Sequence, residues 1–351
     1  MRALILGSAA GGGFPQWNCA CPNCRSLRAG TFHGKARTQT EVAISADGQS
    51  WFLLGASPDL RAQIEATAEL KPGLSALGVG SWESPLPLEF RGAGDASLHL
   101  KNGSAQHGVQ NLRPKTQDLI RQSPIAGAVL ANADIDHVLG LLLLRELQPL
   151  RVHATHSVRR ILREDNSMFR MLERIADQVV WTDFAPGSEF PLCDARGMES
   201  GLTCRAISLA THFPAYVAAE RQANLRPDES SLGLIVESSV VSGGKRIAFL
   251  AAVPAIDDAL LAEIEVCDVL LFDGTFWSDD ELIRVQGSGQ TAREMGHVPV
   301  EDTLRRLERV KRPRKIFVHI NNTNPILDES GAEYRAVRAA GWEIAWDGME
   351  I

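Results

Sequence analysis

The chain has 351 residues, which suits one large domain or two modest ones, and its 44% of hydrophobic residues can bury a sizeable core. The formal net charge of −7, without a basic stripe, argues against nucleic-acid binding. No apolar run reaches the roughly 18 residues that a membrane-spanning helix needs, and the N-terminal apolar run is too short for a signal peptide. We therefore expect a cytoplasmic protein with no membrane insertion.

The N-terminus predicts a strand at residues 3–6 that leads into the glycine-rich segment 7–13. The glycine spacing is not that of a dinucleotide-binding loop, and no Lys-Ser/Thr pair follows as in a P-loop. We therefore expect a backbone that closely approaches a site or a packed helix, rather than a phosphate.

Three cysteines follow within six residues, at Cys19, Cys21 and Cys24. Interrupted by a proline and an asparagine, they form a turn that can wrap one ion, and zinc takes cysteine ligands tetrahedrally in such knuckles. We expect a structural Zn²⁺ here, with unpaired buried thiols as the alternative. The fourth ligand is open, because His33 is nearest in sequence but a later His or Asn returning in space fits equally well.

The next segments predict a hairpin of residues 40–45 and 51–54, then a strand, a polar turn and a helix around residues 56–63. Asp59 in that turn is either a carboxylate that orients a metal-bound histidine or an ordinary charge at a helix N-terminus. Residues 73–116 are rich in Gly, Pro and Ser without a sustained period, so we expect a surface insertion.

A short β-prone run at residues 125–131 leads directly into a cluster of polar side chains, Asn132, Asp134, Asp136 and His137. The first three alternate, so on an extended segment they can point the same way. The apolar run that follows predicts a buried helix. A strand that ends in ligand-type residues before a helix is where α/β proteins place their chemistry, although the aspartates could merely cap the helix.

Three later strands also end in a ligand-type residue, at His212, Asp273 and His319. His297 either donates a proton or contacts substrate, or else caps the next helix. A lone residue of this kind after a strand is usually structural, but four such strand ends in one chain are much less frequent by chance. Gathered at one edge of a sandwich, they would form a metal site.

Between these motifs the hydrophobic pattern predicts further strands and helices. Strands are expected at residues 150–154, 179–210 (several short ones), 233–237, 246–251, 269–273 (followed by a glycine turn) and 315–319, and helices at 157–165, 167–176, 257–264 and 300–311.

This order of strand ends resembles the metallo-β-lactamase superfamily, whose signature H-x-H-x-D-H is followed by a histidine, an aspartate and a histidine on later strands. Asp136 and His137 match the last two positions of the signature, and Asp273 and His319 match the bridging aspartate and the final histidine. His212 falls near the remaining histidine position. The resemblance implies an α/β fold of the metallo-hydrolase/oxidoreductase type, an αββα four-layer sandwich made of two β-α halves in a single domain.

Over residues 1–72 and 125–351 the chain is also similar to the family of pyrroloquinoline quinone (PQQ) biosynthesis B proteins. The segments that carry this resemblance are L-G-S-A-A-G-G-G-F-P-Q-W-N-C-x-C-x-x-C (6–24), A-R-T-Q-T (36–40), A-S-P-D-L-R-A-Q (56–63), D-I-D-H (134–137), D-G-T-F-W (273–277), R-E-M-G-H (293–297) and H-I-N-N-T-N-P-I-L-D-E (319–329).

Asn132 and Asp134 replace the two leading histidines of the superfamily signature, which weakens the pocket of one metal. The pocket of the other metal keeps its ligands, which would be Asp136, His137, Asp273 and His319, with His212 as a further candidate. This set approaches the 2-His-1-carboxylate pattern of non-haem Fe(II) oxygenases. The expected cofactors are thus a structural Zn²⁺ and an active-site Fe²⁺, with Zn²⁺ or Mn²⁺ as alternatives at the second site. Asn132, Asp134 and His297 would be the catalytic residues, and Asp59 and Asn322 would support the ligands.

The family is linked to iron-dependent hydroxylation of the tyrosine ring in a Glu-Tyr precursor of PQQ, so the expected partner is a small-molecule or dipeptide precursor. Carriage of PQQ or its precursor toward the periplasm, and metal-dependent hydrolysis, are the alternatives, and the missing histidines count against hydrolysis. Basic residues that would hold an acidic quinone are not obvious, and Arg37, Arg61 and Arg293 are the candidates. The sequence leaves open whether the chain forms a homodimer.

Overall fold

The computed structural model describes most of the chain, namely residues 1–72, 123–146, 148–210, 212–238 and 244–351. The chain divides into two compact units, Met1–Lys71 with Ser123–Ile351 and Pro72–Gln122. The surface insertion expected at residues 73–116 lies outside the described residues.

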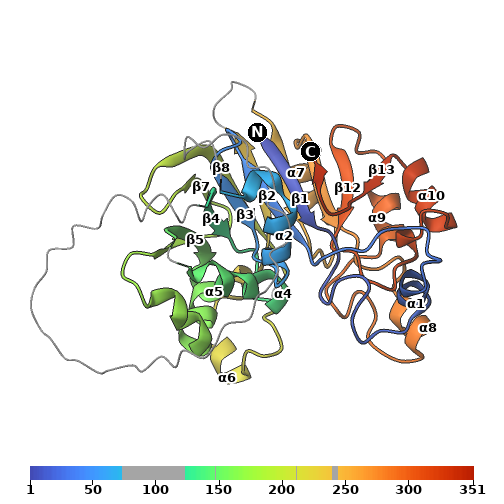
Figure 1. The fold of residues 1–351 in the computed structure, drawn as a ribbon. Coiled ribbons are helices and arrows are strands. Elements are labelled where there is room, and N and C mark those ends of the chain that lie inside the picture. The colour runs from blue at the N-terminus through green and yellow to red at the C-terminus, as the bar shows by residue number, and fades with distance from the viewer. Residues whose placement is uncertain (73–122, 147, 211, 239–243) are drawn as a thin grey trace, which may run out of the picture. The chain divides into compact units, whose positions relative to one another are not determined.

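Two seven-stranded sheets form the larger unit (Figure 1). The first sheet contains, in spatial order, β14 (Met349–Glu350), β1 (Arg2–Gly7), β2 (Glu41–Ser45), β3 (Trp51–Leu54), β4 (Ile125–Val129), β5 (Leu150–Thr155) and β6 (Val179–Phe184). The second contains β13 (Trp342–Ile344), β12 (Arg314–Val318), β11 (Val269–Asp273), β10 (Arg246–Leu250), β9 (Ser231–Ser238), β8 (Glu199–Ala210) and β7 (Glu189–Cys193).

The helices of this unit are short. The α-helices are α1 (Pro22–Arg28), α2 (Leu60–Ala66), α4 (Ile135–Val138), α5 (His156–Arg160), α6 (Ala219–Gln222), α7 (Asp258–Glu265), α8 (Glu281–Gln286), α9 (Val300–Arg306) and α10 (Ala332–Ala339). The 3₁₀ and π segments are η1 (Ala68–Leu70), η3 (Leu139–Arg145), η4 (Ile161–Asp165), η5 (Ser167–Glu173), η6 (Pro227–Glu229) and η7 (Pro325–Leu327). None of the helices in the described residues is long and apolar enough to cross a membrane.

Three apolar cores separate four layers. The inner faces of the two sheets share one core, in which Val42 of β2 and Phe249 of β10 take part. A second core joins the outer face of the first sheet to α2, η3 and α5, and a third joins the second sheet to α7, α9 and α10. Figure 1 shows α2 and α5 along the first sheet and α9 and α10 beside β12 and β13. This is the predicted αββα sandwich.

Parallel strands bring the predicted ligand positions to one edge. β10, β11 and β12 run parallel, and Asp273 at the end of β11 pairs in register with Val318, directly before His319. All five residues of β11 are buried, as expected for a parallel strand that is covered on both faces. In the first sheet β4 runs parallel to β3 and β5, and Asn132 just beyond it bridges to Ser231 at the start of β9. The two sheets therefore meet where the polar cluster begins.

The helix expected after His137 differs from the prediction. α4 has four residues and continues as the 3₁₀ segment η3, and Leu139 and Leu143 are 36% and 38% exposed rather than buried. The backbone N–H of Gly140 donates to Ala56 O at 2.8 Å, so the turn after β3 takes the hydrogen bond that a longer helix would use.

Candidate metal centre

The three thiols of Cys19, Cys21 and Cys24 converge at the start of α1, and their Sγ atoms lie within 4.8 Å of one another. Cys21 is the N-cap and Pro22 the first residue of α1, a position that suits proline because its missing N–H is not needed there. Burial raises the pKa of the Cys21 thiol to about 12, so a thiolate here needs a nearby positive charge. A bound cation would supply that charge, and these donors fit zinc.

Asn322 provides the fourth side chain at the thiols. Its Nδ2 lies 3.1 Å from Cys19 Sγ, 3.5 Å from Cys21 Sγ and 3.4 Å from Cys24 Sγ. A half-turn of the amide would present Oδ1 at the same point. His33 is exposed and does not join the thiol group among the described residues. The side chain that returns in space at the thiols is therefore that of Asn322.

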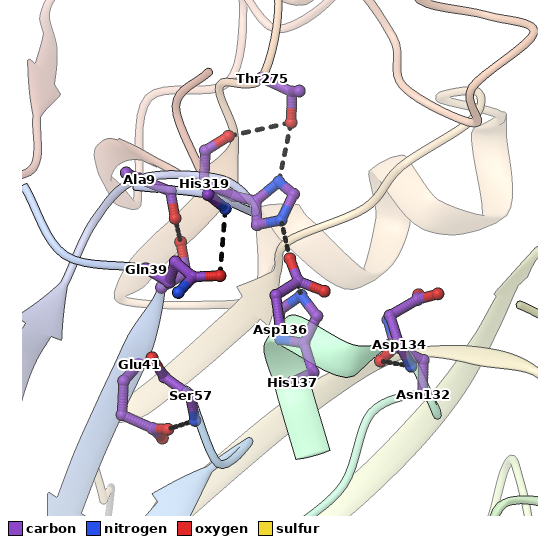
Figure 2. A network of polar contacts seen from close by, with 12 residues as sticks. Ala9, Gln39, Glu41, Ser57, Asn132, Asp134, Asp136, His137, Thr275 and His319 are labelled. Atoms are coloured by element: carbon purple, nitrogen blue, oxygen red, sulfur yellow. Dashed lines mark hydrogen bonds and ion pairs between the residues drawn. The ribbon is translucent and has the colours of Figure 1, made fainter. Parts of the chain in front are cut away.

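A second group combines Asp136 and His137 of α4 with His319, which follows β12 (Figure 2). Asp136 Oδ2 lies 3.4 Å from His319 Nε2 and 3.9 Å from His137 Nε2. Burial disfavours the charged form of Asp136, but the two imidazoles outweigh it and hold the pKa of its carboxyl well below the usual range. Burial lowers the pKa of His137. An ionised carboxylate beside a neutral imidazole is the protonation state that binds a divalent cation.

Asp273 lies with His297 and His319 in a third group, but the protein already uses its carboxylate fully. Oδ1 accepts from Thr275 N at 3.0 Å and from Thr275 Oγ1 at 2.6 Å. Oδ2 accepts from Val253 N at 2.8 Å and lies 2.8 Å from His297 Nδ1. As a metal ligand, which the sequence predicts, Asp273 would have to exchange one of these contacts. In this structure it holds His297.

Thr275, which the sequence analysis missed, connects Asp273 to His319. Its Oγ1 lies 2.9 Å from His319 Nδ1 (Figure 2). A hydroxyl donates one hydrogen and accepts two bonds, so Thr275 donates to Asp273 and accepts from the His319 Nδ1–H. That arrangement leaves the lone pair of His319 Nε2 facing Asp136. The only sequence signal was the position of Thr275 two residues after a strand-terminal aspartate.

His297 is buried beside Asp273 and does not cap the next helix, because the N-cap of α9 is Pro299. Burial lowers the pKa of His297, but the Asp273 carboxylate more than offsets this and the pKa is raised overall. The ring therefore keeps a proton more readily than an isolated histidine, which is consistent with the predicted proton-donor role.

Asn132 and Asp134 occupy the positions at which the superfamily signature has histidines. Asn132 Oδ1 accepts from the Asp134 backbone N–H at 3.1 Å, so this amide is used locally (Figure 2). Burial, and then the charge of Asp136, raise the pKa of Asp134 to about 6. Tyr216 donates its hydroxyl hydrogen to Ala133 O, which covers the same segment.

The glycine-rich loop approaches the site closely, as predicted. A Cβ on Gly11 would stand 3.2 Å from Asp136 Oδ2, so a side chain there would press on the carboxylate. Gln39 supports the loop by accepting from Gly12 N at 3.1 Å, and Asp59 in turn accepts from Gln39 N at 2.9 Å. Asp59 is thus held by Gln39 rather than by a histidine, and it is the N-cap residue of α2, which fits the alternative of a charge at a helix N-terminus.

Other predicted residues lie apart from these groups. His212 is exposed and joins neither histidine group among the described residues. Arg37 is buried and donates to Ala345 O, and Arg293 is engaged in ion pairs. Arg61 is exposed on α2.

Glu41, a further residue that the sequence analysis missed, is fully buried near His137. Its Oε2 accepts from Ser57 N at 2.6 Å, as Figure 2 shows, and burial raises the pKa of its carboxyl to about 8. Its Oε1 and His137 Nδ1 both lack a hydrogen-bond partner among the described residues. A Cβ on Gly55 would lie 3.8 Å from the first atom and 3.7 Å from the second.

Comparison with known proteins supports this description. The profile of the beta-lactamase superfamily domain matches residues 95–320. Coenzyme PQQ synthesis protein B of Methylobacterium sp. (strain 4-46) is 37% identical, and that of Methylococcus capsulatus is 35% identical, each over 100% of this chain and 99% of the relative.

Among solved structures, Zn²⁺-bound PqqB from Methylobacterium extorquens is 34% identical, with a TM-score of 0.77 over 100% of this chain and 99% of that one. A diphosphatase of the PhnP family, 16% identical with a TM-score of 0.57 over 100% and 97% of the two chains, shares the fold. The full-length similarity fits the thiol cluster and the residues at the strand ends. The chain therefore belongs to the coenzyme PQQ synthesis protein B family within the beta-lactamase superfamily.

Proposed function

We propose that this chain acts in PQQ biosynthesis as a non-haem iron hydroxylase that adds oxygen to the tyrosine ring of a Glu-Tyr precursor. The observation that carries the proposal is the group of Asp136, His137 and His319, one carboxylate and two imidazoles within 4.8 Å of one another. This donor set matches the 2-His-1-carboxylate pattern of Fe(II) oxygenases, which leaves ligand positions open. Fe(II) held there would supply the activation of dioxygen.

The neighbouring pocket supports oxidation over hydrolysis. A two-metal hydrolase needs a second cluster of strong ligands beside the first. Here the corresponding positions are Asn132, whose amide oxygen is used by a backbone N–H, and Asp134, whose pKa of about 6 reflects a poorly solvated carboxyl. In our account these two side chains line the space beside the first ion and contact substrate.

His297 would serve the proton steps. Its Nδ1 faces Asp273 at 2.8 Å, so the ring is oriented, and in our proposal its other nitrogen acts on a bound phenol. Thr275 would hold His319 with Nε2 free, and the loop at Gly11 would close the pocket over Asp136. Each role uses a contact of this chain and is independent of the identity of the ion.

The test is single-turnover hydroxylation under controlled oxygen. The protein is loaded with Fe(II) anaerobically, given a Glu-Tyr peptide and a two-electron reductant such as ascorbate, and then exposed to ¹⁸O₂. We expect one labelled oxygen on the ring by mass spectrometry, with the second oxygen leaving as water. Unlabelled product or unchanged peptide, with zinc held tightly by Asp136 and His137, would contradict the proposal. Cleavage of the peptide or of a generic ester would instead indicate a hydrolase.

The carrier alternative makes a different prediction in the same experiment. Tight binding of the precursor that survives His319→Ala, with no reaction, would favour carriage. Loss of hydroxylation in that variant with the peptide still bound would favour catalysis.

A further inference from the structure

Residues 319–324, which we call the 319–324 loop, belong to both metal groups at once. His319 at its start faces Asp136, and Asn322 three residues later touches all three thiols. Few residues separate the two contacts, so a displacement of one end of the loop is expected to move the other end as well.

The thiol end of the loop is anchored through side chain and backbone. Besides the Asn322 amide at the sulfurs, Asn23 of α1 donates to Asn322 O at 3.2 Å and to Asn324 O at 3.1 Å. Cys21 Sγ also lies 3.7 Å from Asn322 O. The helix that carries the thiols therefore holds the loop directly.

The histidine end of the loop is strained. His319 has φ of 55°, the left-handed region that residues other than glycine seldom adopt. Such a conformation persists only where the surroundings fix it on both sides. Before His319 the pairing of β12 with β11 fixes the chain. After it, Ile320 N donates to Ser8 O at 2.9 Å and Asn321 N to Thr275 O at 3.1 Å. Further along, Thr323 donates to Glu281 and Asn324 Nδ2 donates to Gly274 O at 2.8 Å, and between these contacts the Asn322 side chain is held at the thiols.

We propose that Asn322 is a positioning residue through which an ion on the three thiols fixes His319 as a ligand, so that filling the cysteine site tightens ion binding at the Asp136–His137–His319 site. Linkage requires the converse as well, because a coupling free energy is the same in both directions. The inference rests on the proposed function only in taking His319 as a ligand, and it does not depend on the reaction.

The coupling depends on whether the three sulfurs are free thiols or thiolates bound to a cation. Thiols are weak acceptors for an amide hydrogen, whereas three thiolates around a cation form a fixed body that binds the Asn322 amide through either of its polar atoms. With the ion present, the far end of the loop is tied and the strained His319 backbone is maintained. Without it, the Asn322 side chain loses this tie, the loop keeps only its other contacts, and the His319 backbone is fixed less firmly.

The experiment uses Mn(II) as the probe of the second site, because Mn(II) prefers oxygen and nitrogen ligands to thiolates. Binding is followed by the loss of the free Mn(II) EPR signal, in full-length protein that is either stripped of metal and reduced or given one equivalent of Zn(II). We expect the zinc-loaded protein to bind Mn(II) about tenfold more tightly, within the usual range of such couplings. Equal dissociation constants, within about twofold, would overturn the proposal.

Two matched variants locate the effect. Asn322→Ala removes the amide at the thiols, while Asn321→Ala changes the neighbouring side chain, whose Nδ2 donates to Thr323 Oγ1 at 2.6 Å. We expect the zinc-dependent tightening to be lost in Asn322→Ala and kept in Asn321→Ala. Full coupling in Asn322→Ala would overturn the assignment to Asn322.

A second measurement covers the case in which stripped protein unfolds. Both variants are then compared with wild type in the zinc-loaded state, and amide hydrogen exchange is measured at Ile320 and Asn321. We expect faster exchange and weaker Mn(II) binding in Asn322→Ala only, and unchanged values would overturn the proposal. None of these readouts is turnover, so failure of the hydroxylase proposal would leave the result intact.

Discussion

The thiol cluster and the Asp136–His137–His319 site are built in opposite ways. The first takes its three sulfurs from one turn of chain, and the second joins residues that are 183 positions apart at the ends of a β4–α4 connection and of β12. Local assembly gives a site that forms with its own turn and stabilises the chain around it. Assembly from distant strand ends gives a site that exists only when both sheets are packed, with its chemistry at their shared edge.

The two sites also differ in the kind of ion they suit. Three sulfurs select soft or borderline cations such as zinc, while a carboxylate and two imidazoles accept harder ones. A single protein can therefore hold different metals in the two places, and changes at one site can be compared with changes at the other.

Removing Asp136 should have the largest effect. Asp136→Ala takes away the carboxylate that lies within 4 Å of both imidazoles, so we expect Mn(II) or Fe(II) binding to weaken more than about 100-fold. Zinc should still occupy the thiols, with at most the roughly tenfold loss of affinity that the proposed coupling predicts. Metal content by mass spectrometry and Mn(II) EPR measure both sites.

Asp134→Asn is the matched control for that change, because Asp134 is buried within the electrostatic reach of Asp136 and His319 but lies outside the ligand groups of the described residues. It should keep one ion at the second site. An equal loss in both variants would mean that the ligand set extends to the signature positions.

Cys24→Ser should act on stability. Cys24 is fully buried and the change removes one of three sulfurs, so the structural ion is lost together with its contribution to folding. We expect the melting temperature to fall by several degrees, on the order of 2 kcal/mol or more. A chelator should lower the melting temperature of the wild type and leave that of the variant unchanged. A chelator effect of equal size in both would show that the thiols hold no ion.

Thr275→Val should weaken the second site moderately. The change keeps the shape but removes the hydroxyl that joins Asp273 to His319, so His319 loses the contact that sets its tautomer. We expect metal binding to weaken about tenfold, with a stability cost of about 1–3 kcal/mol.

Thr303→Val in α9 is the control for the threonine change, since its buried hydroxyl only donates to Pro299 O at 3.1 Å. Metal binding should be unchanged there. A normal affinity in Thr275→Val would show that another contact orients His319.

The smallest expected effect is a pH dependence of the folding stability, which arises from Glu281 near the 319–324 loop. Burial raises the pKa of Glu281, which accepts from Trp277 N and from Thr323, from 4.5 to about 7. The folded chain thus holds this proton more tightly than the unfolded chain, so the stabilisation is complete below about pH 4.5 and is lost as the pH rises through about 7.

Glu281→Gln should therefore gain stability relative to wild type as the pH rises through that window, by on the order of 1–3 kcal/mol, measured by urea unfolding. A difference between the two proteins that does not change with pH would contradict this account of Glu281.

The parts of the site that depend on local order were predictable from the sequence. The spacing of Cys19, Cys21 and Cys24 predicts a metal site. The position of Asp136 and His137 directly after an apolar strand predicts that they are ligands. The sandwich followed from the order of strands and from the resemblance, and the close approach of the glycine-rich loop followed from its composition. In each case a short stretch carries the information.

The contacts between distant residues were not predictable in the same way. Nothing near Thr275 shows that its hydroxyl reaches His319, because that contact depends on the register of β11 against β12. The partner of Asp59 proved to be Gln39, and His212 lies exposed just after β8. The engagement of Asp273 by His297 likewise needs the packed second sheet.

The central claim, that the two sites hold different ions, is tested most directly by anomalous diffraction from crystals loaded with zinc and iron under anaerobic conditions. Data collected at the two absorption edges should place zinc on Cys19, Cys21 and Cys24 and a single iron between Asp136, His137 and His319. Iron on the thiols, or a pair of zinc ions reaching Asn132 and Asp134, would contradict the account.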